Sequence, residues 1–352
     1  MLKRIHIEEA LKFRDCVFID VRSPKEYNEA TIPGAVNIPI FDNTERELIG
    51  RIYHNINKQC AMEKGLEIAS SKLVDIYRAF KSYSEKYQNI AVFCWRGGMR
   101  SRAVTTILDL MKLPNVHYII GGYKSYRKHV VNFFENLSLN FKLVVIHGMT
   151  GVGKTKVLKI LEEQGYPVID LEDMAGHRGS VFGGIGISQE TSQKMFEAFL
   201  MNKILSIQRP YALVESESSR IGNKIIPKKF VKEMRKGVHM MLTAPLDIRV
   251  KRVVEEYVKK NADFDIEEVK KGLMEIRNRL GAQKYKNLAA LLEKGEFEQV
   301  IEVLLKDYYD PRYRHSSKSY KFDIEIDASN LQKGVSAVKN YLKENFDKIF
   351  WN

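Results

Sequence analysis

The stretch FKLVVIHGMTGVGKTKVLKIL, residues 141–161, decides the fold of the second half of the chain. An apolar run typical of a buried strand leads into a glycine-rich loop, and an amphipathic helix pattern follows the loop. The loop fits the phosphate-binding P-loop spacing G-x-x-x-x-G-K-T. The residues expected to hold a diphosphate are Gly148, Gly151, Gly153, Lys154 and Thr155. The loop amides can cradle the phosphates, Lys154 can neutralise them, and the Thr155 hydroxyl can bind Mg²⁺.

Further strand patterns follow the P-loop, so the second half predicts a P-loop kinase-like α/β domain. YPVID at 166–170 and YALVE at 211–215 indicate strands that end in Asp170 and Glu215. An aspartate directly after four apolar residues, the usual acidic partner of a P-loop, is missing. Asp170 and Glu215 are therefore the candidates to position a metal ion or a water molecule. The polar segments beside them add three candidate substrate or anion contacts, His177, Arg178 and Arg220.

The first half holds a cysteine in a basic, glycine-rich loop, within FCWRGGMRSRA at 93–103. The strand pattern NIAVFC ends at Cys94, and a helix pattern begins near Ser101. The amides of such a loop and the helix N-terminus favour an anion, and Arg96 and Arg100 add positive charge. Surroundings of this kind favour the nucleophilic thiolate, and they would equally stabilise a persulfide, a perselenide or a bound phosphate. We therefore predict that Cys94, Arg96 and Arg100 are catalytic.

Three segments of the first half together resemble a rhodanese domain: FIDVRSPKEYNEATIPGAVNIP (18–39), FCWRGGMRS (93–101) and GGYKSYR (121–127). The resemblance implies a rhodanese-like domain with a parallel sheet, whose loop cysteine carries a transferable chalcogen atom. One departure is that Cys94 and Arg100 enclose five residues, one more than in common sulfurtransferases. The spacing C-x-x-G-x-x-R-S also matches cysteine phosphatases, some of which share the rhodanese fold. Phosphatase activity therefore stays open, although Phe93 stands where those enzymes usually carry histidine.

Two later stretches interleave cations with tyrosines, RNRLGAQKYKNL at 277–288 and DYYDPRYRHSSKSYK at 307–321. Cations bind phosphates, and tyrosine rings can stack on unpaired bases. The formal net charge of +13 also favours a polyanionic partner. The candidate nucleic-acid contacts are Arg277, Arg279, Lys284, Arg312 and Arg314.

Length and cysteine content limit the class of protein. A chain of 352 residues suggests two domains, which we place at 1–135 and 136–352. No apolar run approaches the length of a membrane span, and the N-terminus MLKRIHIEEA lacks the apolar core of a signal peptide. Three scattered cysteines are too few for a disulfide framework or a zinc site. These features predict a cytoplasmic protein with no membrane partner.

The order of motifs along nearly the whole chain resembles the tRNA 2-selenouridine synthase family. The motifs are CWRGGMRS, GMTGVGKT, DLEDMAGHRGSVFG, VESESSRIG and YYDPRY. The resemblance implies a tRNA-modifying transferase that acts on 2-thiouridine at the wobble position of tRNA, which the basic stretches would bind. Geranyl diphosphate would first alkylate the sulfur. Selenophosphate, from a selenophosphate-supplying enzyme, would then replace the geranylthio group with selenium.

The implied chemistry agrees with the residues of both loops. A thiocarbonyl sulfur leaves poorly, and alkylation turns it into a thiol that departs readily. A P-loop with Lys154 and Mg²⁺ would stabilise the departing diphosphate, while Cys94 would carry selenium as a perselenide or hold selenophosphate. Two other classes stay open, an ATP-dependent tRNA sulfurtransferase and a binding module with an inactive rhodanese domain. The P-loop alone does not distinguish ATP from a prenyl diphosphate, whereas the intact Cys94 argues against the binding module.

Overall fold

A computed structural model of the chain describes residues 3–177, 191–259, 266–317 and 319–347. Two five-stranded sheets of parallel strands alternate with helices along the chain, which confirms the predicted α/β fold class. None of the helices in these ranges is both long enough and apolar enough to cross a membrane.

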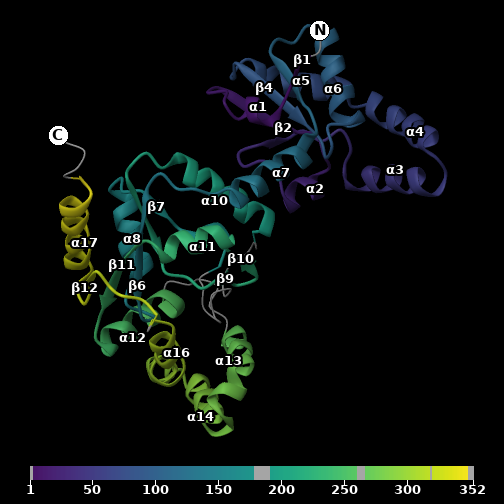
Figure 1. The fold of residues 1–352 in the computed structure, drawn as a ribbon. Coiled ribbons are helices and arrows are strands. Elements are labelled where there is room, and N and C mark those ends of the chain that lie inside the picture. The colour runs from purple at the N-terminus through teal and green to yellow at the C-terminus, as the bar shows by residue number, and fades with distance from the viewer. Residues whose placement is uncertain (1–2, 178–190, 260–265, 318, 348–352) are drawn as a thin grey trace. The chain divides into compact units, whose positions relative to one another are not determined.

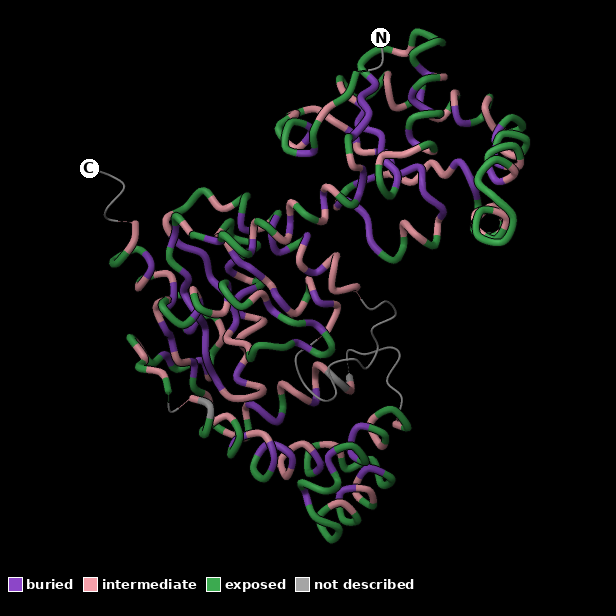
Figure 2. The backbone as a smooth tube through the Cα atoms, turned by 45° about the vertical axis from the view of Figure 1, so that its right-hand side comes forward, coloured by how far each residue is buried: buried purple, intermediate pink, exposed green. Residues whose placement is uncertain are grey.

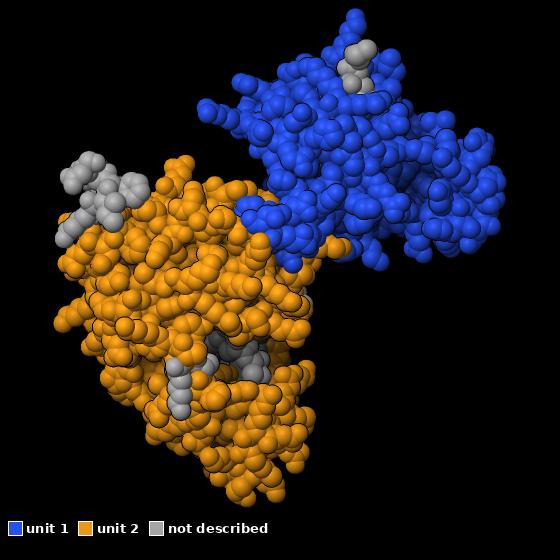
Figure 3. Space-filling model, viewed as in Figure 1, with its two compact units in different colours: residues 1–136, 197–199 blue, residues 137–196, 200–352 orange. Residues whose placement is uncertain are grey.

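The chain forms two compact units, each with its own sheet and its own buried core (Figure 3). Unit 1 comprises residues 1–136 with 197–199, and unit 2 comprises residues 137–196 with 200–352. In both units the buried positions follow the strands of the sheet (Figure 2).

Unit 1 has the rhodanese-like architecture expected for the N-terminal half, with the sheet order β1-β5-β4-β2-β3 (Figure 1). Its strands are β1 (Lys3–Ile5), β2 (Cys16–Asp20), β3 (Val36–Asn37), β4 (Asn89–Phe93) and β5 (Val116–Ile119). Its helices are α1 (Ile7–Ala10), α2 (Pro24–Glu29), α3 (Asn43–Asn55), α4 (Lys58–Ser70), α5 (Leu73–Ser84), α6 (Met99–Leu110) and α7 (Gly122–Glu135). The central strand β4 is an apolar run covered on both faces, so its carboxyl end presents Cys94 at the middle of the sheet.

The sequence favours a helix near 65–86, and the structure differs in having two helices there. The structure has α4 and α5 there, separated at Ser71 and Lys72. The Ser70 and Ser71 hydroxyls donate to backbone carbonyls three residues back, at 2.7 and 2.9 Å. Local side-chain hydrogen bonds of this kind compete with helix continuation. Ser82 and Ser125 make the same bond inside α5 and α7, so these bonds do not by themselves account for the break.

Unit 2 has the P-loop kinase-like architecture, with the sheet order β12-β11-β6-β8-β7. Its sheet strands are β6 (Lys142–Gly148), β7 (Val168–Ile169), β8 (Tyr211–Glu215), β11 (Val238–Thr243) and β12 (Ile324–Asp327), and β9 (Arg220–Ile221) pairs with β10 (Lys224–Ile225) in a hairpin. The helices that alternate with them are α8 (Lys154–Glu163), α9 (Leu171–Ala175), α10 (Gln193–Ser206), α11 (Lys228–Arg235), α12 (Leu246–Val254) and α17 (Leu331–Asn345). Figure 1 shows α8 and α17 side by side along this sheet.

A helical extension separates α12 from β12 within unit 2 (Figure 1). It contains the π-helix η1 (Glu255–Lys259), α13 (Ile266–Leu280), α14 (Ala282–Glu293), α15 (Phe297–Leu304), the π-helix η2 (Leu305–Tyr309) and α16 (Asp310–Ser317). Leu273, Ile276 and Leu288 belong to an apolar cluster of its own. The π-helix η2 leads directly into α16, and π-helical turns often lie at functional sites.

The segment after β5 fixes the loop that carries Cys94. The Tyr123 amide donates to the Cys94 carbonyl at 2.8 Å. Gly97 and Gly122 face each other with φ of +58° and +57°. A Cβ added to Gly122 would lie 2.2 Å from the Cys94 carbonyl oxygen and 2.4 Å from the Gly97 nitrogen. Only glycine at position 122 therefore allows the two loops to approach this closely.

Replacing Gly122 with alanine should destabilise unit 1 and displace the Cys94 loop. Gly34→Ala is the matched control, because Gly34 has φ of +79° but nothing lies within 4 Å of its added Cβ. Both variants carry the cost of a side chain in the left-handed region, about 1–2 kcal/mol, and only Gly122→Ala adds a backbone clash. Calorimetry should show a Tm for Gly122→Ala that is several degrees below that of Gly34→Ala. Equal Tm losses for the two variants would contradict the close approach.

Candidate active sites

The Cys94 loop directs two hydrogen-bond donors at the sulfur. Cys94 follows the last residue of β4 and is 3% exposed, and α6 begins five residues later at Met99. Its Sγ accepts a hydrogen bond from the Gly98 amide at 3.3 Å and from the Ser101 hydroxyl at 3.1 Å. Donors of this kind stabilise a thiolate, which is the nucleophilic form of the side chain.

The two arginines predicted beside Cys94 have different surroundings. Arg96 is exposed. Arg100 is held by Glu26 of α2, which accepts from its guanidinium at 2.6 and 3.1 Å. Burial by itself would raise the pKa of Glu26, but the hydrogen bonds and charge of Arg100 outweigh burial and hold that pKa below its ordinary value. Glu26 therefore stays ionised and fixes Arg100 at the start of α6.

The P-loop lies between β6 and α8 and brings Lys154, Thr155 and Glu215 together. Lys154 Nζ donates to the Gly148 carbonyl at 2.9 Å and lies 3.3 Å from Glu215 Oε1. The Thr155 hydroxyl donates to Glu215 Oε2 at 2.9 Å. Gly151 has φ of +79°, and a Cβ there would lie 2.8 Å from the Arg249 carbonyl oxygen. The predicted acidic partner Glu215, at the end of β8, thus lies against the loop.

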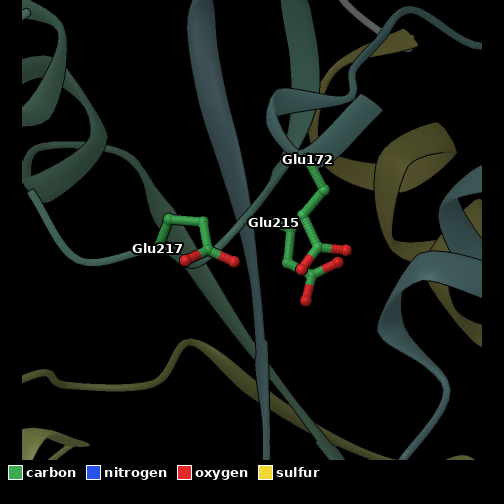
Figure 4. Close-up of side chains that lie close together, drawn as sticks. All are labelled: Glu172, Glu215 and Glu217. Carbon is green, nitrogen blue, oxygen red and sulfur yellow. The ribbon is translucent and has the colours of Figure 1, made fainter. Parts of the chain in front are cut away.

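Two further carboxylates join Glu215, and sequence reasoning missed both. Single oxygens of Glu172, Glu215 and Glu217 all lie within 4.8 Å of one another. Figure 4 shows the carboxylates of Glu172, from α9, and Glu215 turned toward each other. Carboxylate and hydroxyl oxygens are the ligands that Mg²⁺ prefers, so these three side chains and Thr155 fit a Mg²⁺ ion. The segments DLED and VESES, with acidic residues just after two strands, carried the signal.

Burial and mutual repulsion control the charge of this cluster. Burial raises the pKa of Glu172 far above its ordinary value, and the charges of Glu215 and Glu217 raise it further. Burial and Glu215 raise the pKa of Glu217 to about 8. Burial disfavours the charged form of Lys154, but Glu215 and its neighbours outweigh burial and keep that pKa above its ordinary value. Lys154 is therefore a cation, and the cluster retains protons that a divalent cation would displace.

The P-loop pocket has a volume of about 280 Å³ and is closed partly by the helical extension. Tyr309 and Tyr313 line it. Asp310 pairs with Arg249 at 2.8 and 2.7 Å, both side chains are buried, and Arg249 donates to the Thr150 carbonyl at 3.2 Å. The DYYDPRY stretch, predicted only as a nucleic-acid contact, therefore also supports the phosphate loop.

Arg252 of α12 is a further residue that sequence reasoning missed at the P-loop. Its guanidinium donates to the Val152 carbonyl at 2.6 Å and to the Ala328 carbonyl at 2.7 Å. It also lines the pocket that contains Lys154. The basic helix pattern after β11 was the only signal for it, and that pattern is equally typical of a solvated helix face.

Four other predicted residues lie away from the P-loop pocket or outside the described residues. Asp170 accepts from the Asp173 amide at 2.9 Å as the N-cap of α9, and it lines a different pocket. His177 packs against Gly222, where an added Cβ would lie 2.6 Å from its ring. Arg220 is exposed at the start of β9, and Arg178 lies outside the described residues. Their roles stay predictions.

The structure brings the two basic stretches of the helical extension together at Tyr308. The Arg279 guanidinium lies 3.4 Å from the Tyr308 hydroxyl, and the guanidinium of Arg312 lies 4.6 Å above the Tyr308 ring. Tyr308 itself is buried, so it cannot stack on a base. All five predicted contacts are exposed. Arg277 lies above the Tyr285 ring, and Lys284 pairs with Asp307. The fifth is Arg314.

Two family models match the chain and divide it between them. The model of the tRNA 2-selenouridine synthase AAA domain matches residues 141–348, and the rhodanese-like domain model matches residues 6–129. The chain is also similar over most of its length to curated proteins named tRNA 2-selenouridine synthase. The protein from Bdellovibrio bacteriovorus is 32% identical over 335 residues, which cover 84% of this chain and 87% of that protein. The protein from Nitrosomonas eutropha is 28% identical, and the match covers 97% of this chain and 89% of that protein. The protein from Hydrogenovibrio crunogenus is 29% identical, and the match covers 96% of this chain and 97% of that protein.

Removing one carboxylate of the cluster should change how stability depends on pH and on Mg²⁺. Because its pKa is raised in the folded state, Glu172 keeps a proton that the unfolded chain releases above its ordinary pKa. Folding stability therefore falls as the pH rises from that ordinary value toward the raised one. Glu172→Gln cannot titrate, so its metal-free Tm at about pH 8 should exceed that of the wild type by about 2 °C or more.

Mg²⁺ should stabilise the wild type far more than it stabilises Glu172→Gln. It should raise the wild-type Tm more at about pH 8 than at about pH 6, because its ligands must be deprotonated, and it should raise that of Glu172→Gln little. Asp173→Asn, on the same helix but exposed and outside the cluster, is the control and should respond as the wild type does. An equal Mg²⁺ response of wild type and Glu172→Gln at about pH 8 would rule out a metal site at Glu172.

Proposed function

The chain belongs to the tRNA 2-selenouridine synthase family, and on that premise we propose that it converts wobble 2-thiouridine of tRNA into 2-selenouridine in two steps. Geranyl diphosphate alkylates the sulfur in the first step, and selenophosphate supplies selenium in the second. The observation that carries the proposal is the pairing, in one chain, of a P-loop with Lys154 and a thiol loop with Cys94. One site suits a diphosphate leaving group, and the other suits a small chalcogen-bearing anion.

The P-loop of unit 2 is the proposed site of geranylation. The bond from the base sulfur to C1 of the geranyl group forms, the C1–O bond breaks, and diphosphate leaves with the electron pair. The N3 proton of the base goes to water. Lys154 and the loop amides would receive the growing negative charge, and Arg252 would support the loop backbone through Val152. Mg²⁺ bound by Glu172, Glu215, Glu217 and Thr155 would neutralise the diphosphate.

The Cys94 loop of unit 1 is the proposed site of selenium transfer. Selenium in selenophosphate already has the oxidation level of selenide, so a perselenide on Cys94 would need a two-electron oxidant. No oxidant is needed if the Cys94 thiolate attacks phosphorus, because the P–S bond forms, the P–Se bond breaks, and hydrogenselenide leaves with the electron pair. Hydrogenselenide then attacks C2 of the base and expels geranylthiol, and water hydrolyses the phosphocysteine. The donors from Gly98 and Ser101 to Sγ support a thiolate in this role.

The substrate tRNA would meet the exposed cations of the helical extension. Arg277, Lys284 and Arg314 are exposed on α13, α14 and α16, where phosphates can reach them. Arg96 of the Cys94 loop is exposed as well. A tRNA substrate and a selenophosphate-supplying enzyme as partner would place the reaction in the cytoplasm.

The proposal is tested by mass spectrometry of thiolated tRNA after incubation with the protein, geranyl diphosphate and selenophosphate, with each reagent omitted in turn. Omission of selenophosphate should leave S-geranyl-2-thiouridine, and omission of geranyl diphosphate should leave 2-thiouridine. A parallel incubation with ATP in place of geranyl diphosphate should form no new nucleoside. Formation of 2-selenouridine with ATP alone would favour an ATP-dependent transferase instead.

Lys154→Ala should slow geranylation by about 100-fold or more, because the departing diphosphate loses its charge partner. Conversion of S-geranylated tRNA to 2-selenouridine should stay at the wild-type rate, since that step does not use the P-loop. Lys159→Ala is the matched control, because Lys159 is exposed on the same helix and does not line the P-loop pocket. Quenched time courses of the two partial reactions provide the rates. Equal losses in both steps would show that Lys154 does not serve geranylation alone.

A further inference from the structure

Unit 1 contains an apolar pocket that neither loop motif accounts for. It has a volume of about 290 Å³ and lies between α6 and the three helices α3, α4 and α5. Apolar side chains form its walls, among them Ile49, Ala69, Ala103 and Ile107. This volume is close to the lower end of small-ligand sites, which begin at about 300 Å³.

Large apolar side chains that line the pocket are also exposed to solvent. Tyr53, Leu66 and Met99 are 52%, 71% and 54% exposed. They come from α3, α4 and the first residue of α6. A soluble protein seldom gathers exposed apolar side chains around a cavity unless a ligand or partner covers them.

The pocket shares walls with the Cys94 site. Ile40, Phe41 and Ala69 line it and belong to the same buried cluster as Cys94. Arg100, at the start of α6, lines it as well. A group bound there would therefore share Arg100 with an anion held in the Cys94 loop.

Cations line the pocket together with the apolar side chains. Arg46, Lys58 and Arg100 are among the lining residues. Arg46 and Arg100 both approach Glu26, at 3.6 and 2.6 Å, so one carboxylate serves two guanidinium groups. A hydrocarbon without charge would need no cations beside it. An apolar chain attached to a polyanion fits both features.

We propose that this pocket binds the geranyl chain of the S-geranylated base during the selenium step. The inference rests on the proposed function. C2, the atom that selenium attacks, carries the geranylthio group, so the chain must lie beside the selenium donor wherever that donor is held. In the proposed function the selenium donor is held at Cys94, and the pocket shares Arg100 and apolar residues of one buried cluster with that site. Geranyl diphosphate is the less suitable occupant, because its diphosphate group would bind to the P-loop of unit 2.

The geranylthio group then has two roles in the reaction, as the leaving group and as the part of the substrate that positions C2. The C2–Se bond forms and the C2–S bond breaks, and geranylthiolate leaves with the electron pair and takes a proton from water. Burial of the chain also positions C2, since binding energy from a part of the substrate that does not react can orient the part that does. The pocket would therefore make geranylation a mark of specificity as well as a means of activating the sulfur.

The test uses the full-length protein, selenophosphate and anticodon stem–loop RNAs that carry S-geranyl- or S-methyl-2-thiouridine. Both substrates release a thiol, and only one has a chain for the pocket. Wild-type kcat/KM for selenium transfer should favour the S-geranyl RNA by about 100-fold. Ala103→Phe, which fills the pocket from α6, should lower kcat/KM for the S-geranyl RNA by about 10- to 100-fold and leave the S-methyl RNA within about twofold.

Two more variants make the result specific to the pocket. Thr106→Phe, exposed on the same helix and absent from the lining, is the matched control and should leave both substrates unchanged. Leu66→Asp places a charge at a lining position that is 71% exposed, so it should not disturb folding. It should lower kcat/KM for the S-geranyl RNA alone, as Ala103→Phe does.

Several outcomes would overturn the inference. Equal loss of S-geranyl and S-methyl activity in both pocket variants would mean that the pocket does not hold the chain. Full S-geranyl activity in both variants would mean the same. If the variants lose geranylation from geranyl diphosphate while selenium transfer is unchanged, the pocket binds geranyl diphosphate instead of the S-geranylated base. If the wild-type protein converts both RNAs equally well, the pocket does not bind the geranyl chain, but the proposed function still holds. If it converts neither RNA, both the inference and the proposed function are contradicted.

Discussion

Both candidate sites depend on one backbone constraint, a parallel strand that ends in a glycine-rich turn before a helix begins. The first amides of a helix have no partner within it, so they must meet an anion, a side chain or water. At the end of β4 the Cys94 sulfur accepts the amide of Gly98. At the end of β6 the Gly148 carbonyl instead accepts the ammonium group of Lys154, at a helix N-terminus of the kind that favours a phosphate. Close backbone packing at Gly122 and Gly151 fixes the two turns.

The sequence was most informative where this constraint acts locally. The strand–loop–helix patterns predicted both parallel sheets, and Glu215 lies against Lys154 and Thr155. The other carboxylates of the P-loop site were not predicted, because they are far apart in the sequence. Glu172 and Glu217 meet only because the sheet order places β8 between β6 and β7, and single-chain patterns do not reveal strand order. Asp170, two residues from Glu172, caps a helix instead.

The helical segments were the hardest to predict, because their packing is tertiary. The stretch with DYYDPRY is typical of a solvated basic face, yet Asp310 is buried against Arg249 and supports the P-loop backbone. The break between α4 and α5 shapes the apolar pocket and lies where the sequence favours a helix. Two serine side chains bond to the backbone at the break, but Ser82 makes the same bond inside α5, so serine is only a weak signal for the end of a helix. The proposed division of chemistry between the two units thus rests on local motifs, whereas the lining of each site follows from the fold.

The central claim is that unit 2 alkylates the base sulfur and unit 1 exchanges it for selenium. The most direct measurement is mass spectrometry of nucleosides from thiolated tRNA that is treated in two stages. The first stage contains the Cys94→Ser protein, geranyl diphosphate and selenophosphate. The second stage contains the Lys154→Ala protein and selenophosphate. The first stage should accumulate S-geranyl-2-thiouridine without 2-selenouridine, because serine keeps the size of cysteine but stays protonated at neutral pH. The second stage should convert that nucleoside to 2-selenouridine. Formation of 2-selenouridine by Cys94→Ser at the wild-type rate, or a geranylated product that Lys154→Ala cannot convert, would contradict the division.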